Sequence, residues 1–358
     1  MSACIEDWSE TIRQAAASGE PIAIVGGASK DFYGRPALGR PLSTLSHSGI
    51  VAYEPSELSL TARCGTTLAE LEAALASQGQ MLAFEPPHFK GGASLGGAIA
   101  AGLSGPRRAA AGSARDFVLG AKIIDGRGEI LSFGGQVMKN VAGYDVSRLL
   151  AGSLGTLGLL LEISFKVLPL PAATASRRYA VDQPRALELM NSYAGRPLPI
   201  TASAWEDGTM TLRLAGSQAA VAAAEKTLGG ELLACEAAAD YWLGLRDQSA
   251  AFFAGQMPLW RLSLASTTPP LDLPGAILIE WGGAQRWLRS EAPAATIQGA
   301  MAKLGSGAHA SLFRGSEQMR SAGVFQPLAP PLLALQRRLK QRFDPAGILN
   351  RGRMYPEF

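Results

Sequence analysis

The sequence predicts an α+β fold in two domains. Its 358 residues exceed the ~100–200 residues of one ordinary domain, 47% of them are apolar, and 16 of its 41 glycines fall between Gly91 and Gly158. A Pro/Ala-rich segment from Pro169 to Thr174 ends this glycine-rich part, and strand and helix patterns alternate beyond it. We therefore expect a ligand site in the first domain, a boundary near Pro169, and an antiparallel sheet with helices in the second domain.

Composition argues against several other classes of protein. The net charge of +3 is small, and no basic run is interleaved with aromatic residues, which argues against nucleic-acid binding. Cys4, Cys64 and Cys235 are too far apart for an iron–sulfur motif and leave one cysteine unpaired, which favours a reducing compartment. The first residues are acidic, unlike a signal peptide, and the charge-free run Leu149–Leu161 is shorter than the ~18 residues of a membrane span.

Local patterns predict the elements of the first domain. A helix is expected at Thr11–Ala17, and the apolar run Ile22–Val25 reads as a strand that ends in two glycines. Thr67 precedes Glu70 in a capping-box spacing, and Leu68, Leu71 and Leu75 form the buried face of the helix that it begins. Further strands are expected at Gly49–Tyr53, Leu60–Gly65 and Leu159–Val167, with a hairpin of Val118–Ile124 and Ile130–Phe133.

The second domain shows alternating patterns. We expect helices at Arg185–Tyr193 and Gln218–Leu228, and strands at Thr201–Trp205 and Met210–Leu214. The tail, Pro331–Phe343, has the pattern of an amphipathic helix. Its expected apolar side is Leu332, Leu335, Leu339 and Phe343, and its basic residues lie elsewhere, at Arg337, Arg338, Lys340 and Arg342.

The loop after the first strand is the first candidate site. Two glycines are followed there by Ala28, Ser29, Lys30 and Asp31. Consecutive backbone N–H groups wrap a phosphate only where no Cβ obstructs them, so this loop has the chemistry of a pyrophosphate cradle. An ordinary strand-ending turn is the alternative. The glycine spacing is not G-x-G-x-x-G, which argues against a Rossmann site.

A second glycine-rich stretch runs from Glu85 to Gly105. Its paired glycines and small residues indicate a backbone that lies flat against a large planar ligand. A Gly/Ala-rich helix packed closely on a neighbour is the alternative for Gly96–Ala101. Three more glycine segments follow, at 112–120, 134–146 and 152–158.

In this order, and with the closing segment Phe343–Met354, these motifs resemble the FAD-linked oxidases of the vanillyl-alcohol-oxidase/PCMH type. Within that superfamily they are most similar to the FAD-binding subunits of bacterial glycolate oxidase, also called glycolate dehydrogenase. Glu85-Pro86-Pro87-His88 and Met138–Asp145 carry the similarity to that subunit type, which runs over nearly the whole chain.

The resemblance implies a fold and a set of cofactor contacts. Residues 1–170 would be a PCMH-type FAD-binding domain of two α+β subdomains, residues 175–330 an α+β cap of the FAD-linked oxidase C-terminal type, and residues 331–358 a helix and tail that return to the flavin. The positions carried over as FAD-binding are Gly26, Gly27, Ala28, Ser29, Lys30, Asp31, Gly91, Gly92, Ala93, Ser94, Gly96, Gly97, Gly102, Ser104, Gly105, Gly112, Arg115, Asp116, Glu162, Ile163 and Asn350.

Two departures from the family pattern matter. Members that attach FAD covalently carry a His in the first loop, where this chain has Ala28 and Ser29, so we expect non-covalent FAD. The catalytic relatives carry an H-x-H pair, whereas His47, His88 and His309 are far apart in this sequence. We therefore expect no metal and identify no general base; His88 is a weak candidate, with a structural loop histidine as the alternative.

The resemblance implies an FAD-binding subunit of a complex that oxidises glycolate, a small 2-hydroxy acid, to glyoxylate. Its partners would be a second flavin subunit and an iron–sulfur subunit, and electrons would leave through them or to a quinone. Two alternatives stay open: a stand-alone FAD-dependent 2-hydroxyacid dehydrogenase, and a structural subunit without a catalytic role. The expected location is the cytoplasm, with attachment to the inner membrane through partner subunits as a further alternative.

Partner docking has two candidate elements in the sequence. One is the basic surface of the last helix, and the other is the set of Trp242, Trp281 and Trp287. Solvated charge and core aromatic residues are the respective alternatives.

Overall fold

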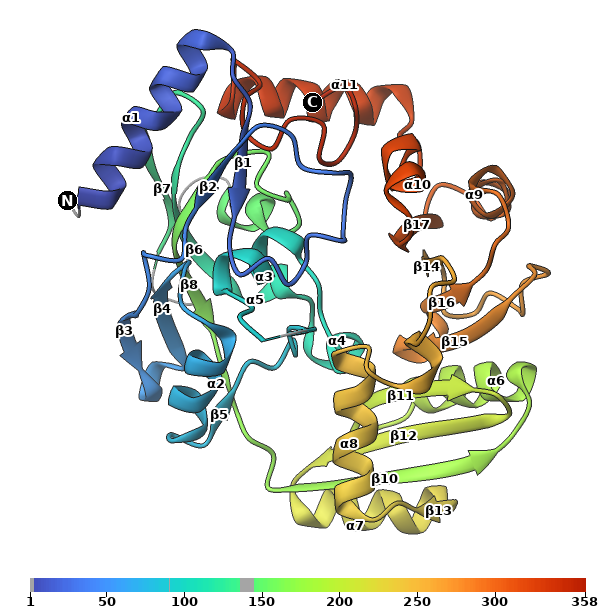
Figure 1. The fold of residues 1–358 in the computed structure, drawn as a ribbon. Coiled ribbons are helices and arrows are strands. Elements are labelled where there is room, and N and C mark those ends of the chain that lie inside the picture. The colour runs from blue at the N-terminus through green and yellow to red at the C-terminus, as the bar shows by residue number, and fades with distance from the viewer. Residues whose placement is uncertain (1–2, 90, 136–144) are drawn as a thin grey trace.

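The computed structural model describes residues 3–89, 91–135 and 145–358. Figure 1 shows two α+β halves side by side, the blue-to-green half and the green-to-orange half, with the last helix lying across the top. Lys90 and most of the Met138–Asp145 motif lie outside the described residues.

The first half is built on a five-stranded antiparallel sheet. Its strands, in spatial order, are β3 (Ile50–Glu54), β4 (Ser59–Arg63), β8 (Leu159–Lys166), β6 (Val118–Ile124) and β7 (Ile130–Gly134). A separate parallel pair, β1 (Ile22–Val25) and β2 (Arg40–Ser43), follows α1 (Ala3–Ser18). The other elements are α2 (Leu68–Ala76), β5 (Gln80–Met81), α3 (Leu95–Ala101), α4 (Arg108–Ala111), α5 (Ala114–Phe117) and β9 (Leu168–Pro169).

The second half is built on an eight-stranded antiparallel sheet. Its strands, in spatial order, are β13 (Glu231–Leu232), β10 (Ala173–Ala180), β12 (Thr209–Gly216), β11 (Ile200–Glu206), β15 (Ala276–Glu280), β16 (Gln285–Arg289), β14 (Leu259–Ser263) and β17 (His309–Arg314). Its helices are α6 (Gln183–Ala194), α7 (Gln218–Leu228), α8 (Cys235–Arg246), α9 (Ala294–Lys303) and α10 (Glu317–Ala322), and α11 (Pro330–Phe343) follows them. The sheets lie on either side of the expected boundary near Pro169; the exact domain limits stay a prediction.

Local sequence signals account for several of these elements. Thr67 caps α2 by accepting a hydrogen bond from the backbone of Glu70, and Leu68, Leu71 and Leu75 are fully buried. The expected hairpin is formed by β6 and β7, and α7 has the predicted bounds. The first helix begins eight residues earlier than expected, at Ala3, because Ile5 and Trp8 join Ile12 in a buried cluster.

The last helix differs from the expectation in which residues it buries. Leu332 and Leu335 are each 53% exposed, whereas Leu339 and Phe343 pack against the core of the first half. Lys340, expected on the basic outer side, is buried and donates hydrogen bonds of 2.7 Å to Asp344, to the carbonyl of Thr156 and to the carbonyl of Leu349. Its ammonium therefore fastens the helix to the chain that follows it.

The three tryptophans considered for docking are core residues, since Trp242, Trp281 and Trp287 are between 5% and 6% exposed. Trp281 also donates a hydrogen bond from Nε1 to the carbonyl of Gly105, across the junction of the two halves. None of the described helices is both long and apolar enough to cross a membrane.

Candidate functional site

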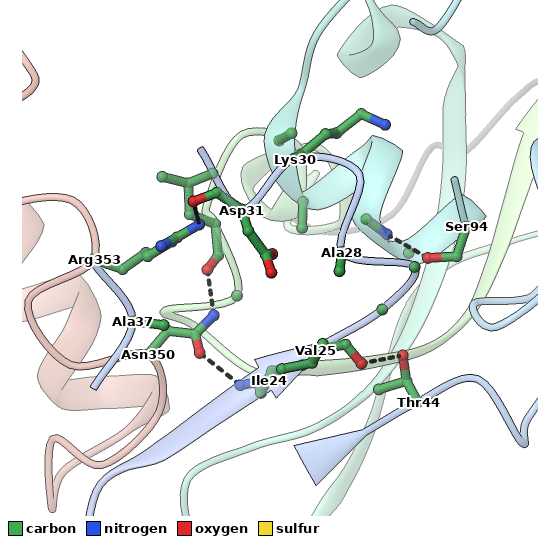
Figure 2. A pocket seen from close by; sticks show the side chains of 18 of the residues that line it. Ile24, Val25, Ala28, Lys30, Asp31, Ala37, Thr44, Ser94, Asn350 and Arg353 are labelled. Atoms are coloured by element: carbon green, nitrogen blue, oxygen red, sulfur yellow. Dashed lines mark hydrogen bonds between the residues drawn. The ribbon is translucent and has the colours of Figure 1, made fainter. Parts of the chain in front are cut away.

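A pocket of about 370 Å³ lies where the loop after β1 meets α3 and the C-terminal tail. This volume is in the range of small-molecule sites. Figure 2 shows Ile24 and Val25 along the lower side, with Ala28, Lys30 and Asp31 above them, Ser94 at the right, and Asn350, next to Ile24, and Arg353 at the left. The pocket therefore draws on several segments that are far apart in the sequence.

The glycines of the first loop leave no room for a side chain. A Cβ added at Gly27 would lie 1.6 Å from the carbonyl oxygen of Gly92, and one at Gly26 would lie 2.5 Å from the hydroxyl of Ser94. Ala28 has a φ of +54°, in the left-handed region that is uncommon for residues other than glycine. Within the part of the chain that the structure describes, the backbone N–H groups of 26–30 have no hydrogen-bond acceptor. They are available to a ligand with negatively charged oxygens.

The start of α3 forms the adjoining wall. Ser94 caps this helix by accepting a hydrogen bond from the backbone of Gly97. A Cβ added at Gly96 would lie 2.8 Å from the Cβ of Cys64, so the helix packs closely on β4 and the turn after it. The close helix packing is seen at Gly96, and Ser94, Gly96 and Gly97 line the pocket, whereas their contact with a large planar ligand stays a prediction.

Asn350 closes the pocket from the tail. Its Oδ1 accepts a hydrogen bond of 2.7 Å from the backbone of Ile24, and its Nδ2 donates one of 2.6 Å to the carbonyl of Leu154 (Figure 2). A Cβ added at Gly155 would lie 2.6 Å from this Nδ2. The returning tail, strand β1 and the glycine segment before β8 are thus held together by one buried side chain.

Three cations surround the loop. Arg320 of α10 and Arg353 of the tail both donate to the backbone carbonyl of Asp31, at 2.7 and 3.2 Å. Burial lowers the pKa of Lys30 to about 8, opposed by the charge of Asp247, and burial lowers the pKa of Arg353 to about 10, with the charge of Arg320 acting in the same direction. The basic groups give the pocket wall a charge that suits phosphate.

The structure brings ten of the residues carried over as FAD-binding to the wall of this pocket. They are Gly26, Gly27, Ala28, Ser29, Lys30, Asp31, Ser94, Gly96, Gly97 and Asn350.

The remaining carried-over residues do not line this pocket among the residues that the structure describes. Gly92 supports the loop through its contact with Gly27, Ala93 and Ile163 lie in the core, and Gly102 ends α3.

The structure places Gly91 at an exposed position and Arg115 on the surface. Glu162 lies 4.0 Å from the ammonium of Lys122. Gly112 contacts Asp116, which completes the cap of α5 with Ser113. Ser104 and Gly105 line a different cavity, at the junction of the two halves.

Several pocket residues were not identified from the sequence. Arg320 is a single arginine without a motif, Arg353 lies in the closing segment Phe343–Met354 but was not singled out there, and Thr44, Ala37 and Glu317 come from loops and ends of elements. Leu154, Gly155 and Gly158 belong to the 152–158 glycine segment, which counts among the glycines expected to form the ligand site but whose residues were not named as individual contacts. Of these, the glycine segment and the closing segment carried a usable signal.

His88 has structural partners. Its Nε2 lies 3.2 Å from a carboxylate oxygen of Glu72, and its backbone N–H donates to Asp247 at 2.8 Å. Glu85, three residues earlier, forms an ion pair of 2.8 Å with Arg213 of the second half. The Glu85–His88 segment thus connects the two halves, and His88 is not part of the pocket wall.

Comparisons with known proteins agree with this geometry. A family model described as an FAD binding domain matches residues 3–134. The glycolate oxidase subunit GlcE of Escherichia coli strain K12 is 47% identical over 348 residues, which cover 97% of this chain and 96% of that protein. The structure of p-cresol methylhydroxylase with substrate bound aligns with a TM-score of 0.71 at 14% identity, over 98% of this chain and 87% of that one.

The fold is of the PCMH type, and the family model together with the 47% identical relative makes the chain an FAD-linked oxidoreductase. The chain belongs to the family of the glycolate oxidase subunit GlcE. The resemblance and the cofactor expected from the sequence are therefore confirmed.

A more distant relative matches a smaller part. The glycolate oxidase subunit GlcD of Bacillus subtilis strain 168 is 34% identical over 122 residues, which cover 34% of this chain and 26% of that protein.

Proposed function

We propose that this chain is the FAD-holding subunit of a complex that oxidises glycolate to glyoxylate. The observation that carries the proposal is the pocket itself: a loop whose amides lack acceptors within the described chain, and whose glycines could not be replaced without a clash. The high identity to a glycolate oxidase subunit over nearly the full length supports the choice of substrate.

Particular residues would hold FAD. The amides of 26–30, with Lys30 and Arg353 nearby, suit the pyrophosphate, because they offer N–H donors and positive charge in a partly buried site. Ser94 and Asn350 fix the walls around it. The first loop has no histidine, cysteine or tyrosine, so we propose that FAD is bound without a covalent link. FAD supplies the two-electron redox chemistry, and the protein supplies its position and surroundings.

Partners are part of the proposal. Cys4, Cys64 and Cys235 are distant from one another in the sequence, so we propose that electrons leave this chain through other subunits, among them a second flavin subunit and an iron–sulfur subunit. We propose that the complex works in the cytoplasm, held at the inner membrane by its partners.

The direct test is reconstitution. The sister subunits would be purified with wild-type chain, without this chain, or with a Gly27→Ala chain that cannot close its loop around FAD. We expect glycolate-dependent dye reduction only with the wild-type chain. Full activity of the sister subunits without this chain would contradict the proposal, and activity of the isolated chain would favour a stand-alone dehydrogenase instead.

A further inference from the structure

The outer side of α11 carries a stripe of exposed side chains. Leu332, Leu335, Arg338 and Arg342 follow one another at intervals of three and four residues, so they share one side of the helix. All four are exposed, the two leucines at 53% each. Figure 1 shows this helix along the upper edge of the molecule. We call these four residues the α11 stripe.

The two arginines of the stripe are unpaired. Neither guanidinium has a hydrogen bond, an ion pair or an aromatic ring beside it among the described residues. Arg185 of α6, which is also exposed, is by contrast paired with Glu188 of its own helix at 3.0 Å. The sequence holds no Asp or Glu between Glu317 and Asp344, so α11 offers its arginines no such neighbour. Their charge is left for a group outside the described chain.

This arrangement is unfavourable for the chain on its own. Arg338 and Arg342 are four residues apart, where like charges on a helix repel each other. The helix dipole favours a cation in the last turn, which accounts for Arg342 but not for Arg338, one turn earlier. The two exposed leucines add apolar surface in contact with water. A partner that supplies carboxylates and an apolar surface would relieve both costs.

The distribution of these residues favours a protein partner over a lipid surface. A helix that lies on a membrane carries apolar residues on one side and basic residues on the other. The apolar side of α11 is already used, because Leu339 and Phe343 pack against the core of the first half. On the outer side, leucines occupy the N-terminal part of the stripe and arginines the C-terminal part. Apolar residues mixed with arginine, without aspartate, glutamate or lysine, are typical of protein–protein interfaces.

The inner side of the same helix holds the tail that lines the FAD pocket. Lys340 donates hydrogen bonds to the carbonyls of Thr156 and Leu349, both of 2.7 Å. Gly155 and Asn350, which are next to these two residues in the chain, line the pocket. A subunit bound on the α11 stripe would therefore be separated from the wall of the FAD pocket by this helix and its tail. Such a place suits a subunit that takes electrons from the flavin.

We propose that the α11 stripe is the surface on which a sister subunit of the glycolate-oxidising complex docks. The contact surface of that subunit presents carboxylates to Arg338 and Arg342, and an apolar patch to Leu332 and Leu335. The charges steer the encounter and fix the orientation of the two subunits, and the apolar contact excludes water around them. This inference rests on the proposed function, because it names the place where the proposed partner binds.

The test is assembly of purified components. The FAD-containing chain and its variants would be mixed with the purified sister subunits, and dissociation constants would be measured at low and at high salt. We expect Arg338→Glu and Leu335→Gln each to weaken assembly by about tenfold or more. Both side chains are exposed, so flavin content and the urea midpoint should stay as in wild type. Salt should weaken assembly of the wild-type chain more than that of Arg338→Gln.

Arg337→Glu is the matched control. Arg337 is also an exposed, unpaired arginine of α11, and the substitution changes the net charge by the same amount as Arg338→Glu. Its side chain lies on another side of the helix, because consecutive helical residues are rotated by about 100°. It should change the dissociation constant by less than about threefold. Vesicles of phosphatidylethanolamine and phosphatidylglycerol provide an anionic lipid surface, and the wild-type chain should not bind them.

The results separate the two claims. The docking surface is wrong, even where the complex oxidises glycolate, if Arg338→Glu and Leu335→Gln assemble as wild type does. It is also wrong if Arg337→Glu disrupts assembly as strongly as Arg338→Glu, or if the wild-type chain binds the vesicles and no sister subunit. If assembly depends on Arg338 and Leu335 but the complete complex does not oxidise glycolate, the surface stands and the proposed function is wrong.

Discussion

The side-chain oxygen of Asn350 accepts a hydrogen bond of 2.7 Å from the backbone of Ile24, 326 residues earlier in the chain. Backbone hydrogen bonds from Ile22 to Ile348 and from Asn350 to Ile22, of 2.8 and 2.9 Å, place the tail beside β1. The C-terminal segment therefore braces the strand that delivers the phosphate-binding loop. FAD binding and the integrity of the tail are linked through this contact.

Replacing Asn350 by alanine should weaken both FAD binding and the packing of the C-terminal tail. The backbone N–H of Ile24 and the carbonyl of Leu154 would lose their partner in a buried place, which costs about 2–4 kcal/mol for the two groups. We expect a lower urea midpoint and a lower ratio of flavin to protein absorbance in the purified variant. Asn191→Ala is the control: Asn191 bonds three carbonyls of the second half, so its loss should lower stability without releasing FAD. Full flavin content in Asn350→Ala would contradict the account.

Gly27→Ala should abolish FAD binding, because its Cβ would overlap the carbonyl of Gly92 and force the loop open. The measurement is flavin content after purification and after incubation with excess FAD. Gly299→Ala, in helix α9 with open space around it, should keep full flavin content and leave stability equal or slightly higher. A yellow Gly27→Ala protein with normal stoichiometry would show that this loop does not hold the cofactor.

The flavin should leave the protein on denaturation. Ala28 and Ser29 occupy the positions where covalent members carry a histidine, so acid precipitation should leave a colourless pellet and a yellow supernatant. A pellet that stays yellow after washing would indicate a covalent link, with His88 as the first residue to replace.

Glu280 should make stability depend on pH. Burial raises its pKa to about 7, against hydrogen bonds from Trp287 and Gln285 that lower it. The folded protein therefore keeps this proton where the unfolded chain, with a pKa near 4.5, has lost it. The stabilising effect is complete below about pH 4.5 and is lost as the pH rises to 7.

Glu280→Gln removes this dependence. Relative to wild type, the variant should gain stability between pH 4 and pH 8, by an amount on the order of 3 kcal/mol for a shift of this size. Urea unfolding at both pH values measures it, with Glu206→Gln as a control because Glu206 is only half-buried and its pKa is raised less strongly. An equal difference between Glu280→Gln and wild type at both pH values would refute the prediction.

Sequence patterns predicted the local elements well and the long-range arrangement poorly. Ile22–Val25 and the Thr67 cap depend on neighbouring residues, so periodicity and capping chemistry identify them. Lys340 belongs to a helix whose pattern predicts a solvated lysine, yet two carbonyls and Asp344 pair with it in the interior. Such burial depends on where the tail returns, which no local pattern contains.

In the candidate site, too, sequence patterns predicted some residues and missed others. Gly26, Gly27 and Ser94 were found because a glycine cradle leaves a sequence signature. Arg320 was not found, because a single arginine carries no signature, and Arg353 was not singled out within the closing segment, because both reach the loop only through tertiary packing. Gln248, which follows α8, and Arg261, on β14, line the same cavity at the junction of the two halves only through the tertiary packing of the second half.

The central claim is most directly tested by counting the flavins that glycolate reduces. The complete complex would be titrated anaerobically with glycolate while the visible flavin band is followed, once with wild-type chain and once with the Gly27→Ala chain. We predict that the wild-type complex holds one more FAD per copy of this chain than the variant complex, and that glycolate bleaches this additional flavin. Equal flavin content in both complexes, or an additional flavin that glycolate leaves oxidised, would contradict the account.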